Sequence, residues 1–174
     1  FAPKNLGLSE EEIAERVSEA AKLTGLTEDL LDKSPFELSG GQKRRVAIAG
    51  VMAMKPKVLI LDEPAAGLDP SGREMIMKSI MGYKARTGAT IVIVSHSMED
   101  MARFCDEIIV MAHSKLVMQG KCGEIFSRAD ELESVGLDIP QITRLMLELK
   151  SRGVDVEDGI YTIKDAASSL SRIL

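Results

Sequence analysis

A pair of glycines stands between a serine and a glutamine at the point where an amphipathic helix is expected to begin. Ser39 can accept a hydrogen bond from a backbone N–H group of the next turn, and Gln42, three residues on, can reach back to the N–H of Ser39. The glycines leave this helix start without a Cβ, so that a phosphate can approach the unpaired N–H groups. The candidate anion-binding residues are Leu38, Ser39, Gly40, Gly41 and Gln42.

The basic turn Lys43–Arg45 follows these residues directly. Cations in the first turn of a helix oppose its dipole and cost about 0.3–1 kcal/mol each when they are exposed. An anion bound nearby is the simplest reason to tolerate them. The sequence alone leaves one alternative open at this point, a capped helix with a solvated basic turn, because such capping boxes are common.

Two carboxylates follow a continuous apolar run of strand length, Val58–Leu61. A carboxylate at the end of a strand can hold Mg²⁺ through water, and Asp62 is the candidate. Because adjacent strand residues point to opposite faces, Glu63 must lie on the turn that leaves the strand in order to face the same ligand. There it can orient and deprotonate a water molecule as a general base. The alternative is a pair of acidic residues that only solvates the strand end.

Two further polar residues follow predicted elements. His96 comes after the apolar run Thr90–Val94, so it is expected at the same edge of a parallel sheet, where an imidazole can bind a phosphate or a water molecule. An ordinary surface or core histidine is the alternative. Asp69 precedes Pro70 and is a good helix cap in its own right. His113 has no such placement and is expected to be structural.

Together these motifs resemble the C-terminal half of an ATP-binding-cassette (ABC) ATPase. The matching segments are the signature LSGGQ at Leu38–Gln42, LILDEP at Leu59–Pro64, the loop Gly67–Asp69 and the isolated His96. Their order and spacing make the resemblance specific, and it covers residues 1 to about 126.

The resemblance implies a role for each candidate residue. Asp62 would bind Mg²⁺ through water in the Walker B motif, and Glu63 would be the general base. His96 matches the switch histidine, which contacts the γ-phosphate or the attacking water. Asp69 matches the loop that contacts the opposite subunit, and Leu38–Gln42 would bind the ATP held by that subunit. The implied ligands are ATP and Mg²⁺.

Two elements of that family are absent from these 174 residues. The sequence contains no G-x-x-x-x-G-K-[ST] phosphate loop and no glutamine loop before the signature. In the family, ATP lies between two subunits, with the phosphate loop and Walker B on one and the signature on the other. We therefore expect full-length relatives to hydrolyse ATP and this chain alone to be inactive.

The expected fold class is α/β, the C-terminal half of a P-loop NTPase with a parallel-sheet core. Continuous apolar runs separated by helical patterns predict parallel strands that are covered on both faces. Residues 1–8 are expected to be loop, and a capping box at Ser9 and Glu12 starts a helix that Gly25 stops. The predicted divisions are a helical signature subdomain at residues 1–39, the ATPase core at 40–126 and an extension at 127–174.

The extension changes character from the core. It contains a helix pattern at Pro140–Lys150 and a final one at 165–174, and the segment Gly136–Ile142 resembles the ATPases of energy-coupling-factor importers. The first helix carries an apolar stripe with no evident place on an already covered sheet, so we expect it to dimerise. Folding back on the core is the alternative. The stripe residues are Ile142, Leu145, Met146 and Leu149.

Composition narrows the classes of protein. With 22 basic and 27 acidic residues and a net charge of −5, the composition disfavours nucleic-acid binding without excluding it. No apolar run approaches the roughly 18 residues of a membrane span. Cys105 and Cys122 lack ligand-like neighbours, which favours a reducing compartment over disulfides or zinc. No signal peptide is visible, and a start at Phe1 suggests that a preceding segment is missing.

The leading interpretation is the C-terminal part of an ATPase subunit that powers an importer of cobalt, nickel or vitamins. The expected partners are a second ABC ATPase subunit, identical or different, and transmembrane subunits, at the cytoplasmic face of the membrane. One alternative is the split head of a chromosome-maintenance or DNA-repair ATPase, which should show heptads before the signature. Another is a non-catalytic interaction module.

Overall fold

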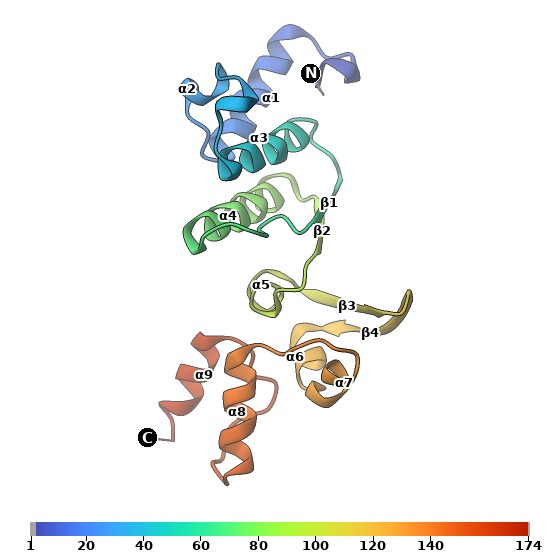
Figure 1. The fold of residues 1–174 in the computed structure, drawn as a ribbon, viewed down its shortest axis with the longest axis vertical. Coiled ribbons are helices and arrows are strands. Elements are labelled where there is room, and N and C mark those ends of the chain that lie inside the picture. The colour runs from blue at the N-terminus through green and yellow to red at the C-terminus, as the bar shows by residue number, and fades with distance from the viewer. Residues whose placement is uncertain (1–2, 174) are drawn as a thin grey trace. The chain divides into compact units, whose positions relative to one another are not determined.

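The computed structural model describes residues 3–173, and these form two compact units that divide between Val94 and Ser95. Each unit contains one two-stranded sheet among the described residues. The predicted division at residues 39 and 126 stays a prediction. The order of elements along the chain can be followed by colour in Figure 1.

Capped helices form most of the first unit. Helix α1 spans Glu10–Leu23 and begins at the predicted capping box, in which Ser9 Oγ accepts from Glu12 N at 3.3 Å. Part of the predicted N-terminal loop is instead a 3₁₀ helix, Pro3–Leu6, because its backbone closes a turn from Gly7 N to Lys4 O. Phe1 and Ala2, in the same predicted loop, lie outside the described residues. The remaining helices of this unit are α2 (Glu28–Leu31), a 3₁₀ turn (Pro35–Glu37), α3 (Gly40–Met52) and α4 (Pro70–Thr87).

Helix α3 lies between α1 and α4 and packs on both (Figure 1). The three helices contribute Ala20, Ala49, Met52 and Ile80 to the buried interior of the unit. Tyr83 is also buried, and its hydroxyl donates to the carbonyl of Pro56 at 2.9 Å. Helix α4 is thereby fixed to the segment that leads into the first strand.

The two strands of this unit are parallel, as predicted. Strand β1 spans Val58–Asp62, β2 spans Thr90–Val94, and Leu59 pairs with Ile91 in register. Helix α4 connects them and packs on β2, which makes a β-α-β unit.

The prediction that both faces of this sheet are covered is wrong for the described residues. Leu59 is 2% exposed, whereas Ile60, its neighbour on the other face, is 68% exposed. The reason is the two-residue period of a strand: α4 covers one face, and no described element of this unit covers Val58, Ile60, Val92 and Val94.

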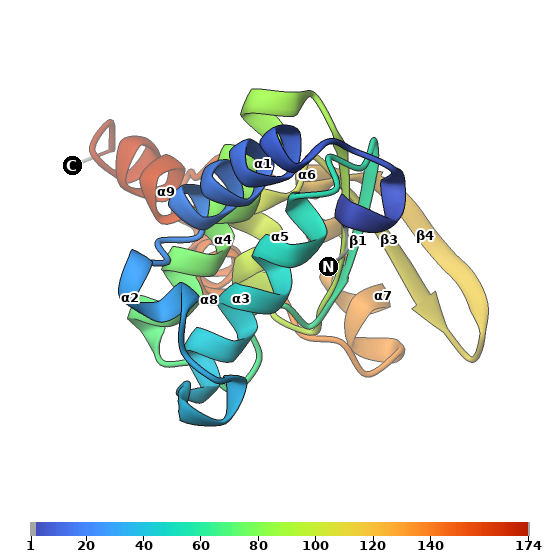
Figure 2. The same ribbon diagram turned by 90° about the horizontal axis from the view of Figure 1, so that it is seen from above.

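The second unit begins with helix α5, Met98–Phe104, followed by the antiparallel pair β3 (Glu107–Ala112) and β4 (Lys115–Lys121). The two strands form a hairpin, which Figure 2 shows as a long two-stranded arm. His113 and Ser114 form its turn with φ of 50° and 59°, the left-handed values that tight hairpin turns need.

Short helices follow the hairpin. They are α6 (Cys122–Phe126), α7 (Ala129–Ser134), α8 (Gln141–Ser151) and α9 (Ile163–Leu170). Both cysteines are free thiols, and burial raises the pKa of Cys122, whose Sγ donates to the carbonyl of Cys105 at 3.0 Å. The predicted last helix starts earlier and ends at Leu170, and Leu174 lies outside the described residues.

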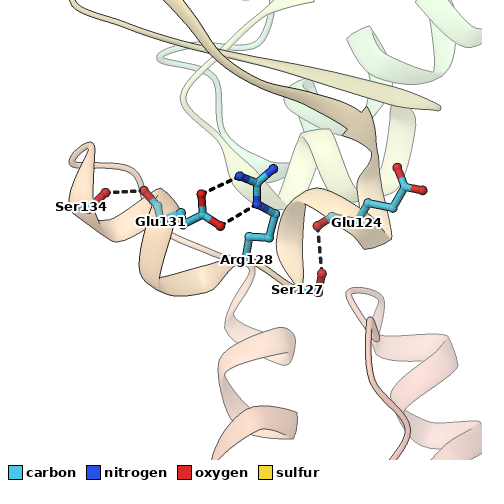
Figure 3. A network of polar contacts seen from close by, with 5 residues as sticks. All are labelled: Glu124, Ser127, Arg128, Glu131 and Ser134. Atoms are coloured by element: carbon cyan, nitrogen blue, oxygen red, sulfur yellow. Dashed lines mark hydrogen bonds and ion pairs between the residues drawn. The ribbon is translucent and has the colours of Figure 1, made fainter.

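Polar contacts lie at the end of α6 and along α7, as Figure 3 shows. Arg128 Nε donates to Glu131 Oε1 at 2.7 Å, and hydrogen bonding from Arg128 lowers the pKa of Glu131. Ser127 and Ser134 donate to the carbonyls of Glu124 and Glu131. These contacts therefore close the ends of two helices of only five and six residues.

The apolar stripe of α8 is covered within the second unit, contrary to the sequence argument. Met146 is 3% exposed and forms a buried cluster with Val156, Ile160 and Ala166, and Ile142 and Leu149 pack against it. The loop after α8 and helix α9 supply this cover. The sequence argument considered only the core sheet as a packing surface for the stripe and therefore missed it. Leu145 is the exception at 46% exposed. Dimerisation through this extension stays a prediction.

No helix within residues 3–173 has the length and apolar character that crossing a bilayer requires.

Leu145 and Leu149 form a matched pair that separates the two roles of this helix. We expect Leu149→Glu to lower the melting temperature of the chain, because it places a charge against the buried cluster. Leu145→Glu should leave the melting temperature nearly unchanged and weaken self-association in sedimentation velocity. Unchanged association of Leu145→Glu would contradict dimerisation through this surface.

Candidate nucleotide site

The signature stretch forms the exposed N-terminal turn of α3. Ser39 N donates to Gln42 Oε1 at 2.8 Å, and Gln42 N donates to Ser39 Oγ at 3.3 Å, so both halves of the predicted capping box are present. Leu38 is buried and anchors the turn, whereas Ser39 and Gly40 are exposed. A Cβ on Gly40 would meet nothing within 4 Å, which leaves open space above this turn for a ligand.

Two of the three cations in the basic turn bind backbone carbonyls of the same unit. Arg44 Nη1 donates to the carbonyls of Glu63 at 2.8 Å and Ala66 at 2.9 Å, and Arg45 Nη1 donates to the carbonyl of Gly25 at 2.7 Å. These hydrogen bonds give a reason for the two arginines that the sequence reasoning missed. Only Lys43 keeps an exposed position in this turn.

The carboxylates stand at the end of β1, as predicted. Asp62 is the last residue of the strand and is exposed. Glu63 lies on the turn that leaves the strand and has φ of 45°, a left-handed value that costs a residue with a Cβ about 1–3 kcal/mol. Its N–H donates to Val94 O at 2.8 Å, and its carbonyl accepts from Ala66 N at 3.2 Å. The backbone of the turn is therefore bonded to the end of β2 and to itself.

Asp69 begins α4 as its N-cap, and its Oδ1 accepts from Gly72 N at 3.3 Å. The loop that contains Asp69 lies beside the signature turn, since a Cβ on Gly41 would stand 3.6 Å from Leu68 Cδ2. The first unit thus brings the signature turn, the Glu63 turn and the Asp69 cap into one local assembly.

His96 belongs to the second unit, two residues beyond the end of β2. It is exposed and precedes Ser97, the N-cap of α5. His96 thus follows the second parallel strand along the chain, and its role beside the carboxylates stays a prediction.

The donor chemistry at the strand end suits Mg²⁺. No group of three or more histidine, cysteine or acidic side chains that could hold a metal is present within residues 3–173. Mg²⁺ does not need such a cage, because it keeps several waters and binds through one or two carboxylates plus phosphate oxygens. The exposed carboxylate of Asp62 fits this mode of binding.

Comparisons with known proteins identify the family to which the chain belongs. Residues 3–66 match the family model described as ABC transporter. Over the whole chain, identity is 52% to the energy-coupling factor transporter ATP-binding protein EcfA2 of Caldanaerobacter subterraneus subsp. tengcongensis. Identity to the protein of the same name from Clostridium acetobutylicum is 53%. This chain belongs to the ATP-binding-cassette family. It spans 61% of the length of these two curated relatives.

Solved structures of this ATPase family show the same fold. The structure of cbiO1 from Clostridium perfringens, described as part of the ABC transporter complex cbiONQ, has 46% identity and a TM-score of 0.64. It is matched over 80% of this chain and 55% of its own. The dimeric bacterial ABC transporter cassette MJ0796 has 34% identity and a TM-score of 0.58, over 66% of this chain and 49% of its own. The predicted fold class is thereby confirmed.

Proposed function

We propose that this chain supplies the signature and Walker B part of the ATP-hydrolysing subunit of an energy-coupling-factor importer. The observation that carries the proposal is the 52–53% identity, along the entire chain, to two proteins named as ATP-binding subunits of such transporters. In a pair of such subunits, the signature turn and the Glu63 turn of one chain would serve two different nucleotide sites. Their packing against each other and against the Asp69 loop supports the proposal, because it fixes the parts of the two sites relative to one another.

Glu63 is the proposed general base. Because Glu63 lies on the turn beyond β1, its side chain does not have to point to the face opposite that of Asp62. Hydrogen bonds to its N–H and its carbonyl hold its backbone in place. A carboxylate placed in this way can orient the attacking water and accept its proton. Asp62 would hold Mg²⁺ through water, and bound Mg²⁺ neutralises charge on the β- and γ-phosphates. His96 would bind the γ-phosphate or the attacking water.

The signature turn is the proposed contact to ATP held by the opposite subunit. Ser39 and Gly40 are exposed, and the unpaired N–H groups of the first α3 turn suit an anion. Asp69 would contact that same subunit. The partners of the assembly are then a second ABC ATPase subunit, identical or different, and transmembrane subunits at the cytoplasmic face of the membrane. The cargo class is cobalt, nickel or vitamins.

The chromosome-maintenance alternative gains no support from the structure. Helix α1, which precedes the signature, has 14 residues and ends at the C-cap Thr24, after which Gly25 adopts φ of 63°. A split-head ATPase needs a long coiled coil at this place.

The first prediction on function concerns the 174-residue chain by itself. It should neither bind MgATP at micromolar affinity nor hydrolyse it, because its sequence contains no phosphate loop with the associated lysine. Calorimetry with MgATP measures the affinity, and the full-length subunit is the positive control. Tight binding with turnover by the purified chain would contradict the prediction.

The second prediction on function is that Glu63→Gln in a full-length subunit keeps ATP binding and lowers hydrolysis. A general base contributes roughly 10²–10⁴-fold to the rate, and the amide cannot accept the proton. Steady-state ATPase assays measure the loss, and Glu15→Gln, which removes an exposed carboxylate from α1, is the matched control. A fall of less than about tenfold would remove Glu63 from this role and favour His96.

A further inference from the structure

A single guanidinium joins the helix that starts with the signature to the turn that carries Glu63. Arg44 extends from α3 and is partly buried. Its Nη1 nitrogen carries two N–H groups, and it donates to the carbonyl of Glu63 at 2.8 Å and to that of Ala66 at 2.9 Å. The arginine therefore bonds to both ends of the four-residue turn.

This turn needs such a restraint. Glu63 has φ of 45°, and a left-handed residue with a Cβ persists only where its surroundings hold it there. The bonds from Glu63 N to Val94 O and from Ala66 N to Glu63 O fix one donor and one acceptor. Arg44 adds a charge-assisted donor to the Glu63 carbonyl and bonds the carbonyl of Ala66 as well.

The position of Arg44 in α3 explains why this restraint bears on function. Arg44 lies two residues after Gln42, in a helix whose first turn is the exposed signature. A displacement of α3 would move the donor that holds the Glu63 peptide. The side chain of Glu63 would then change direction, because φ of its own residue sets where its Cβ points.

We propose that Arg44 is a positioning residue for Glu63, which it holds in the left-handed conformation and ties to the signature helix of the same subunit. The proposal rests on the assignment of Glu63 as general base. Arg44 touches neither nucleotide nor water in this role and acts only through the backbone of the turn.

A double-mutant cycle in the full-length subunit tests the proposal, with Arg44→Gln and Glu63→Gln alone and combined. Arg44→Gln should lower kcat about 10- to 100-fold, the size of effect expected from a misplaced catalytic group, and leave KM for ATP within about twofold. In the Glu63→Gln background, the same change should lower the residual single-turnover rate by less than about twofold, because the group that Arg44 positions is already lost.

Two further variants serve as controls. Arg16 Nη1 donates to the carbonyl of Met54 at 3.4 Å, also partly buried in the first unit, and Arg16→Gln should leave kcat within about twofold. Arg44→Lys keeps a cationic donor and should give a kcat between those of wild type and Arg44→Gln. Hydrogen exchange should be faster at the Ala66 N–H in Arg44→Gln and unchanged along α4.

The outcomes separate the two assignments. If Glu63→Gln lowers kcat but Arg44→Gln does not, the positioning role is overturned and the general base stands. If Arg44→Gln instead lowers the rate by the same factor in the wild type and in the Glu63→Gln variant, that result also overturns the positioning role, because a loss of folded protein would lower both rates equally. If Glu63→Gln itself keeps a full rate, the assignment of the base fails, whatever Arg44→Gln does.

Discussion

The peptide of Glu63 is the point on which the first unit depends. Its N–H bonds to Val94 at the end of β2, and its carbonyl accepts from Ala66 and from Arg44 of α3. The end of β2, the turn itself and a side chain of α3 thus all bond to the backbone of one residue in an unfavourable left-handed conformation. Such a conformation costs about 1–3 kcal/mol and persists only where the surrounding structure holds it in place. Residues of this kind cluster at active sites.

The β-α-β unit builds this arrangement from local rules. Asp69 caps α4 and Pro70 suits its first turn, so the chain leaves the Glu63 turn directly into a helix. The helix runs back over one face of the sheet and is pinned by the Tyr83 hydroxyl on Pro56. Gly88, with φ of 68°, ends it and lets β2 pair in parallel with β1. The strand that follows delivers Val94 to Glu63.

Sequence reasoning succeeded where the physics is local. The capping boxes at Ser9 and Ser39 and the place of Glu63 beyond the strand follow from residue types at fixed spacing. It failed where distant segments meet. The carbonyls that Arg44 binds lie 19 and 22 residues further along the chain, and no periodicity encodes them. The one hint in the sequence that Arg44 has a bonding partner was the energetic cost of cations in the first turn of a helix. The cover of α8 was missed for the same reason, since Val156 and Ile160 come from a loop.

The most direct measurement is a crystal structure of the full-length subunit, as the ATP-bound dimer, with Mg²⁺ and a non-hydrolysable ATP analogue. The account predicts a water molecule in line with the γ-phosphate and within about 2.6–3.2 Å of a carboxylate oxygen of Glu63. It also predicts that Glu63 keeps a positive φ with its carbonyl bonded to Arg44. A water held only by His96, with the Glu63 carboxylate turned away from the phosphate, would contradict it.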